Sequence, residues 1–149
     1  ICLYLADRYG LGSSAEEVGS INRGKIYQWC LFAMTKLDAH TLYTLYKHGG
    51  KMKNIYGESE VATKTAKEGF ETQILKLENK LKSGKEYLID NTFSVADILM
   101  GTCILFALNL ELENLLEVPT NCTRYFSDLK EREAFKKASE LNYPRTVPE

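Results

Sequence analysis

The positions of proline constrain this chain more than any other feature, because proline removes a backbone donor and interrupts α-helices. The three prolines of the 149-residue chain are Pro119, Pro144 and Pro148. Residues 1–118 therefore permit long, uninterrupted helices. No stretch alternates apolar and polar residues as a half-buried strand does. The sequence predicts an all-α fold.

Two segments carry apolar residues at helical spacing. The first extends over residues 21–46 and ends at the pair Gly49 and Gly50. The second is a regular stripe that ends at Gly84; its members are Ala66, Phe70, Ile74, Leu77 and Leu81. A stripe of this kind indicates an amphipathic helix with one face packed on a core. We expect two long helices here.

A third segment, residues 95–110, is apolar on every side, which is typical of a helix buried all round. Residues 1–9 resemble the last turns of a helix that ends at Gly10, where glycine can adopt the left-handed cap. One or two shorter helices are expected after Pro119. The sequence thus predicts a bundle of about five to six helices around a buried central helix at residues 94–111, with an extended tail at 143–149.

The start of the central helix carries the sharpest local motif. Ser94 suits the N-cap position, and Asp97, three residues later, completes a capping box. Phe93 and Ile98 occupy the two positions of a hydrophobic staple. A carboxylate at this spacing is far more often structural than catalytic. From capping alone, Asp97→Ala is predicted to cost roughly 1–2 kcal/mol.

Charge and cysteine usage exclude several classes of protein. Nineteen basic and twenty acidic residues give a net charge of −1, which argues against nucleic-acid binding. The only histidines, His40 and His48, are too far apart to share a metal ion on one helix, and no CxxC pair occurs, so no metal site is expected. The longest apolar run is too short and too polar to span a membrane. The spread of the four cysteines is typical of reduced thiols in a cytoplasmic protein.

Four motifs, in order, resemble the C-terminal, all-helical half of cytosolic glutathione S-transferases of bacterial or theta-like type. Residues 1–9, ICLYLADRY, are similar to the "AI-x-x-YLA-x-x-Y" helix that ends the family's thioredoxin-like domain. Residues 27–34, YQWCLFAM, are similar to the first long helix of its helical domain. Residues 93–98 and 129–135 are similar to its "F-[ST]-x-A-D" cap and its "L-x-x-R-x-x-F" segment.

The resemblance implies a division of the chain into residues 1–10, the last helix of a missing thioredoxin-like domain, and residues 11–142, the helical domain. The first residue, Ile1 instead of Met, agrees with a fragment of a longer protein. In this family the thioredoxin-like domain holds glutathione. We therefore expect no catalytic or cofactor-binding residue in this chain, and no activity of the chain alone. Glutathione is expected as the co-substrate of the full-length protein.

The resemblance also implies that this half shapes an apolar acceptor pocket and the dimer interface. The first long helix is rich in aromatic residues, and Trp29, Phe32 and Lys36 occupy positions that face the cleft in family members. Core or dimer contacts are the alternative interpretation of these three residues. A homodimer through the first two long helices is expected.

The resemblance implies that the full protein conjugates glutathione to apolar electrophiles, although peroxidases, isomerases and dehalogenases share this half. The alternative is a non-catalytic interaction module, as in translation-factor or aminoacyl-tRNA synthetase assemblies.

Overall fold

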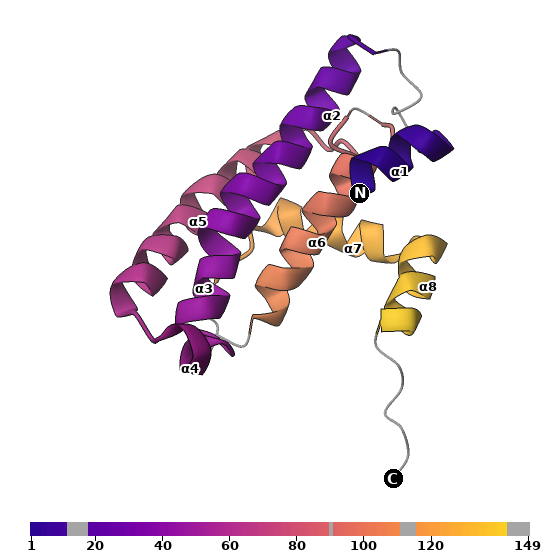
Figure 1. The fold of residues 1–149 in the computed structure, drawn as a ribbon. Coiled ribbons are helices and arrows are strands. Elements are labelled where there is room, and N and C mark those ends of the chain that lie inside the picture. Colours follow the sequence, from indigo (N-terminus) through magenta and orange to yellow (C-terminus); the bar gives the residue numbers. More distant parts are fainter. Residues whose placement is uncertain (12–17, 90, 111–115, 143–149) are drawn as a thin grey trace.

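A computed structural model describes residues 1–11, 18–89, 91–110 and 116–142 of the chain (Figure 1). Within these ranges no β-strand occurs, and the only strand-like pairing is an isolated bridge between Ile89 and Thr92. The all-α prediction is confirmed. The elements are α1 (Cys2–Tyr9), α2 (Ile21–Phe32), η2 (Ala33–Leu42), α3 (Tyr43–His48), α4 (Lys53–Tyr56), α5 (Glu60–Leu81), α6 (Val95–Asn109), α7 (Thr120–Lys130) and α8 (Glu133–Asn142).

The helix α1 ends where the sequence predicts. Gly10 has a φ of 63° and a ψ of 40°, the left-handed conformation that glycine adopts without steric cost. The following residue, Leu11, donates its N–H to the carbonyl of Ala6 at 2.9 Å, which closes the end of the helix.

The segments α2, η2 and α3 form one continuous helix, the long purple rod of Figure 1. It begins at Ser20, whose hydroxyl accepts a hydrogen bond from the N–H of Arg23 at 3.2 Å. It ends where Gly49 and Gly50 both donate to the carbonyl of Leu45, at 2.8 and 2.9 Å. Its middle part, η2, is a π-helix, whereas the sequence pattern predicted an ordinary α-helix throughout.

The helix α5 packs along this long helix and also contacts α7. All five members of the stripe predicted from residue 66 to residue 81 are buried, so that prediction is confirmed. The two helices approach closely at Gly69, where an added Cβ would lie 3.2 Å from Cγ2 of Thr41.

The helix α6 lies at the centre of the bundle and contacts α1, α2, η2 and α7 (Figure 1). The prediction of a central helix is confirmed, but α6 is not covered on every side. Thr102 is exposed, Ile98 is 39% exposed and Leu108 is 48% exposed. The physical reason is that α1, α2, η2 and α7 pack on other sides of α6, and none of the described elements covers the side that carries these exposed residues.

The helices α7 and α8 complete the described fold. Buried Tyr125, Phe126 and Leu129 anchor α7, and the ring of Phe126 meets that of Phe135 in α8 edge to face, with centroids 5.9 Å apart. None of the described helices has the length and apolar character needed to cross a membrane. The predicted extended tail, residues 143–149, lies outside the described residues.

Candidate functional site

The π-helical segment η2 determines which side chains of the long helix face α6. In η2 the N–H of Tyr43 donates to the carbonyl of Asp38, five residues earlier, instead of the usual four. The wider turn rotates the residues that follow it relative to those before it. Adjacent Thr41 and Leu42 are consequently both buried, and the Thr41 hydroxyl donates to the carbonyl of Leu37.

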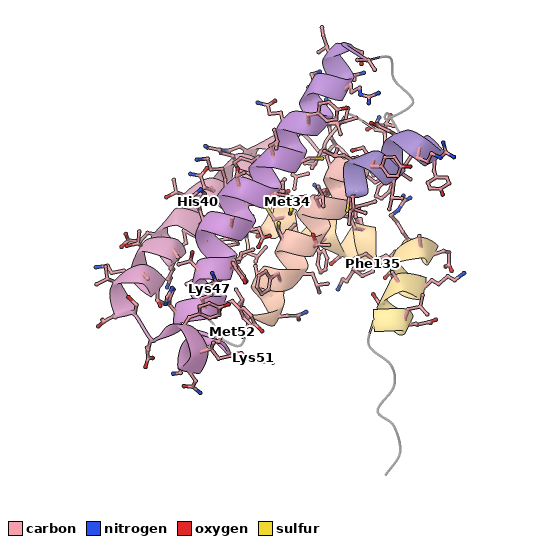
Figure 2. The ribbon with its side chains drawn as sticks, viewed as in Figure 1. Met34, His40, Lys47, Lys51, Met52 and Phe135 are labelled. Carbon is pink, nitrogen blue, oxygen red and sulfur yellow. The ribbon has the colours of Figure 1, made fainter. Side chains whose placement is uncertain are left out.

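An open cavity of about 350 Å³ lies between this helix and α6. Its lining residues are Met34 and Asp38 of η2, Tyr43 and Tyr46 of α3, and Thr102, Cys103 and Phe106 of α6. Figure 2 shows Met34 on the side of the long helix that faces α6. The extra residue of the π turn allows Asp38 and Tyr43, five positions apart, to line the same cavity.

Aromatic rings form most of one wall of this cavity. The rings of Tyr46 and Phe106 meet edge to face across the two helices, with centroids 5.7 Å apart and planes at 69°. The Tyr43 side chain is 41% exposed, and the Lys47 ammonium lies 4.5 Å from the centre of its ring. Such a wall suits a flat, apolar ligand.

Asp38 is the only carboxylate among the lining residues. It is half-buried, and burial raises its pKa above the ordinary value of 3.8. Within the described part of the chain, no hydrogen bond or ion pair to its side chain is present. Burial, together with the charge of Asp38, raises the pKa of the Cys103 thiol to about 12, so this thiol is protonated and unreactive at neutral pH.

The residues that the sequence predicted for the acceptor pocket are not among those that line this cavity. The Trp29 and Phe32 rings contact each other, with centroids 5.5 Å apart, and the Lys76 ammonium of α5 lies 5.6 Å from the centre of the Phe32 ring. Lys36 is exposed. None of Trp29, Phe32 and Lys36 lines the cavity beside α6.

Met34 and Asp38 were not predicted as site residues from the sequence. Their spacing of four places them on one side of a helix, but an isolated acid in an amphipathic segment is usually solvated. No local pattern in the sequence predicted the π turn, which brings Tyr43 and Tyr46 to the side of the helix that carries Met34 and Asp38.

The capping motif of α6 forms a buried polar site of its own. The carboxylate of Asp97 is fully buried and accepts hydrogen bonds from the N–H of Leu88 at 2.9 Å, the N–H of Ser94 at 2.8 Å and the Tyr125 hydroxyl at 2.7 Å. The Ser94 hydroxyl oxygen accepts from the N–H of Ala96 at 3.2 Å. These donors occupy the carboxylate, so its role is to hold the structure.

The two predicted staple residues lie in different environments. The Phe93 ring packs edge to face against Tyr87, and the Arg132 guanidinium lies 3.5 Å from the centre of the Phe93 ring. Ile98, in contrast, is 39% exposed. Their mutual contact stays a prediction.

A second cavity, of about 600 Å³, lies between α5 and the start of α7, and its lining includes Glu71 and Glu117. The Glu71 carboxylate is already paired with Lys67 at 3.7 Å, and no aromatic ring lines this cavity. Among the described residues, no group of three or more His, Cys, Asp or Glu side chains could hold a metal ion. The cavity beside α6 is therefore the better candidate for an organic ligand.

Comparison with known proteins places this chain in a family. Residues 34–133 match the family described as "Glutathione S-transferase, C-terminal domain". No curated protein is significantly similar in sequence.

Three solved structures share the fold. Glutathione transferase F2 from Populus trichocarpa is similar with a TM-score of 0.71 and 17% identity, over 93% of this chain and 65% of that one. Glutathione transferase URE2P6 from Phanerochaete chrysosporium, in complex with oxidized glutathione, has a TM-score of 0.72 and 21% identity, over 93% and 62%. URE2P8 from the same organism, also with oxidized glutathione, has a TM-score of 0.63 and 20% identity, over 93% and 61%. The chain thus spans somewhat less than two thirds of the length of these transferases.

Proposed function

Because the chain belongs to the family of glutathione S-transferase C-terminal domains, we propose that it is the acceptor-binding half of a glutathione transferase. The observation that carries this proposal is the open, largely apolar cavity between η2, α3 and α6, with Tyr46 and Phe106 in contact across it. Glutathione would be held by a thioredoxin-like domain, of which residues 1–10 are the last helix, and residues 11–142 form the helical domain.

In the complete protein, the glutathione thiolate would attack an electrophilic carbon of the acceptor. A C–S bond forms, and the leaving group departs with the electrons of the bond that breaks. The contribution of this half would be to hold the acceptor in a fixed position, which lowers the entropy cost of bringing two molecules together. A non-catalytic interaction module is not favoured, because the three similar structures are all glutathione transferases.

Two sets of residues are candidates for the acceptor wall. The cavity supports Tyr46 and Phe106, whereas the resemblance to the family supports Trp29, Phe32 and Lys36. Substitution of one phenylalanine from each set distinguishes the two candidates, because Phe106 lines the cavity and Phe32 faces α5.

The experiment is a titration of the isotopically labelled chain with nitrobenzene, an unreactive aromatic that resembles an aryl electrophile. Saturable shifts are expected for amides around the cavity. Phe106→Ala should weaken binding about fivefold, the equivalent of about 1 kcal/mol, and Phe32→Ala should leave it nearly unchanged. The reverse result would assign the acceptor wall to the set around Trp29 and Phe32. No saturable binding would refute the acceptor-site proposal.

Glutathione itself provides a second measurement. We expect the 149-residue chain to bind glutathione more weakly than about 1 mM, because the proposed thiol-binding domain is a separate one. A submillimolar dissociation constant, measured by calorimetry, would contradict this division of roles.

We also propose that the protein is a cytoplasmic homodimer associated through its first two long helices. The resemblance to the family supports the interface, and two exposed leucines, Leu31 on α2 and Leu75 on α5, are the residues at which it can be tested. The location is supported by the cysteines, because the four thiols are free, as is usual in a reducing compartment.

A further inference from the structure

The cavity beside α6 combines aromatic walls with a single unpaired acid. We propose that it binds organic cations, with an ammonium group beside Asp38 and an apolar or aromatic body against the rings of Tyr46 and Phe106. This inference names the ligand class of the proposed acceptor cavity, and its meaning for transfer chemistry rests on that proposed function.

The state of the Asp38 carboxylate supports a cationic ligand. Two other aspartates of the described residues have partners within the protein: Asp7 pairs with Arg23 at 2.7 Å, and Asp97 accepts several buried hydrogen bonds. Asp38 is half-buried and has no such partner among the residues that the structure describes. A carboxylate removed from water without a partner is costly, and a bound cation would offset that cost.

Two polar donors on the α6 wall of the cavity already have acceptors within the protein. The Thr102 hydroxyl donates to the carbonyl of Leu99 at 2.7 Å, and the Cys103 thiol donates to the carbonyl of Ala33 at 3.6 Å. These two groups are therefore not available to an anionic ligand, whereas the oxygens of Asp38 are available to a donor. The α6 wall therefore offers these two donors to no anion, and Asp38 offers an acceptor to a cation.

The aromatic rings also support a cationic ligand, because the faces of such rings attract cations within about 6 Å. The Lys47 ammonium, near the lower end of the long helix in Figure 2, lies 4.5 Å from the centre of the Tyr43 ring and 4.8 Å from that of Tyr56. A ring that lines this cavity thus already accepts one ammonium group. Lys47 is the basic side chain in contact with a lining ring. An anionic ligand attracted by the Lys47 ammonium is therefore the alternative to a cationic ligand in this cavity.

The test compares three ligands of nearly the same shape and different charge: benzylammonium, benzyl alcohol and benzoate. Each is titrated into the 149-residue chain at neutral pH, and binding is followed by amide shifts. Benzylammonium is expected to bind about tenfold more tightly than benzyl alcohol, the factor that a charge-assisted hydrogen bond provides, and benzoate most weakly.

Variants assign the preference to one carboxylate. Asp38→Asn keeps the size of the side chain and removes its charge, so the preference for benzylammonium over benzyl alcohol should disappear. Asp38→Glu should retain it. Asp128→Asn is the matched control, because it makes the same change at an exposed site on α7 and should retain the full preference.

Equal binding of benzylammonium and benzyl alcohol to the unmodified chain would overturn the inference, and this measurement does not depend on a variant that folds. A preference that survives Asp38→Asn, or tightest binding of benzoate, would also overturn it. In these cases saturable nitrobenzene binding would still support the acceptor cavity, so the two proposals fail separately. If nitrobenzene and all three ligands fail to bind, both are wrong.

Discussion

At the scale of single residues, the Asp97 carboxylate joins three parts of the chain. It accepts from the N–H of Leu88 before α6, from the N–H of Ser94 at the start of α6, and from the Tyr125 hydroxyl on α7. Burial is the main cause, and the charge of Asp97 the second, that raises the pKa of Tyr125 well above its ordinary value. The Tyr125 hydroxyl therefore keeps its proton and donates it to Asp97 in a hydrogen bond. A capping box therefore also fastens α7 to α6.

Asp97→Ala is expected to reduce the free energy of unfolding by about 3 kcal/mol or more, because several buried donors lose their acceptor together. This exceeds the value expected from helix capping alone. Urea denaturation measures the loss. Tyr125→Phe, which removes a single donor, should cost only about 1 kcal/mol. Equal effects of the two substitutions would show that Asp97 acts through Tyr125 alone.

At the scale of helices, α5 supplies a cap to α7. The start of α7 follows Pro119 and has no capping side chain of its own. The Glu78 carboxylate instead accepts from the N–H groups of Asn121 and Cys122 at 3.0 and 3.2 Å, and from the Asn121 side-chain amide at 2.6 Å. A negative charge at this end also complements the helix dipole.

The stability that Glu78 contributes should depend on pH. Partial burial acts to raise the pKa of Glu78, but the hydrogen bonds from Asn121 and Cys122 outweigh it, and the pKa lies below the ordinary 4.5. A lowered pKa in the folded state stabilises the protein above the unfolded pKa, and this contribution is lost as the pH falls through the folded pKa. Glu78→Gln should therefore cost about 1 kcal/mol at neutral pH and almost nothing well below pH 4.5.

Urea denaturation of the unmodified chain and of Glu78→Gln at neutral and acidic pH provides the measurement. Glu68→Gln makes the same change on the exposed side of α5 and is the control, with little effect at either pH. A Glu78→Gln effect of the same size at both pH values would show that the carboxylate charge does not support α7.

At the scale of the whole molecule, the first two long helices present uncovered apolar residues. Leu31 of α2 is 60% exposed and Leu75 of α5 is 52% exposed. The Lys76 ammonium of α5 lies over the Phe32 ring of α2. Leu31 directly precedes Phe32 in the chain, and Leu75 directly precedes Lys76, so both leucines lie next to this contact between the two helices. Single exposed leucines are common on protein surfaces, so the proposed interface rests on the resemblance to the family, and Leu31 and Leu75 are the residues at which it can be tested.

Leu31→Arg and Leu75→Arg are each expected to shift the protein from dimer to monomer, because a buried, unpaired guanidinium opposes association. Light scattering measures the mass in solution. Leu108→Arg is the matched control, since Leu108 is 48% exposed on α6, and this variant should remain a dimer. A monomeric unmodified chain, or a dimer that tolerates both substitutions, would refute the proposed interface.

The local features of this protein could be predicted from its amino-acid sequence. Helical periodicity predicted the buried stripe of α5, a run of uniformly apolar residues predicted the central helix α6, and glycine predicted the end of α1 at Gly10. Ser94 and Asp97 stand at the N-cap and third positions that their spacing indicates. These features were accessible because capping and periodicity depend on residues within one or two turns of each other.

Tertiary structure alone decided the features that join distant residues. The cap that Glu78 supplies to Asn121 and the bond from Tyr125 to Asp97 exist only because helices pack side by side. The same packing places Phe32 against α5, whereas the π turn places Asp38 in the cavity beside α6. The apolar spacing of the sequence is that of an ordinary α-helix, so it did not predict the π turn, a rare element defined by bonds to the fifth residue back.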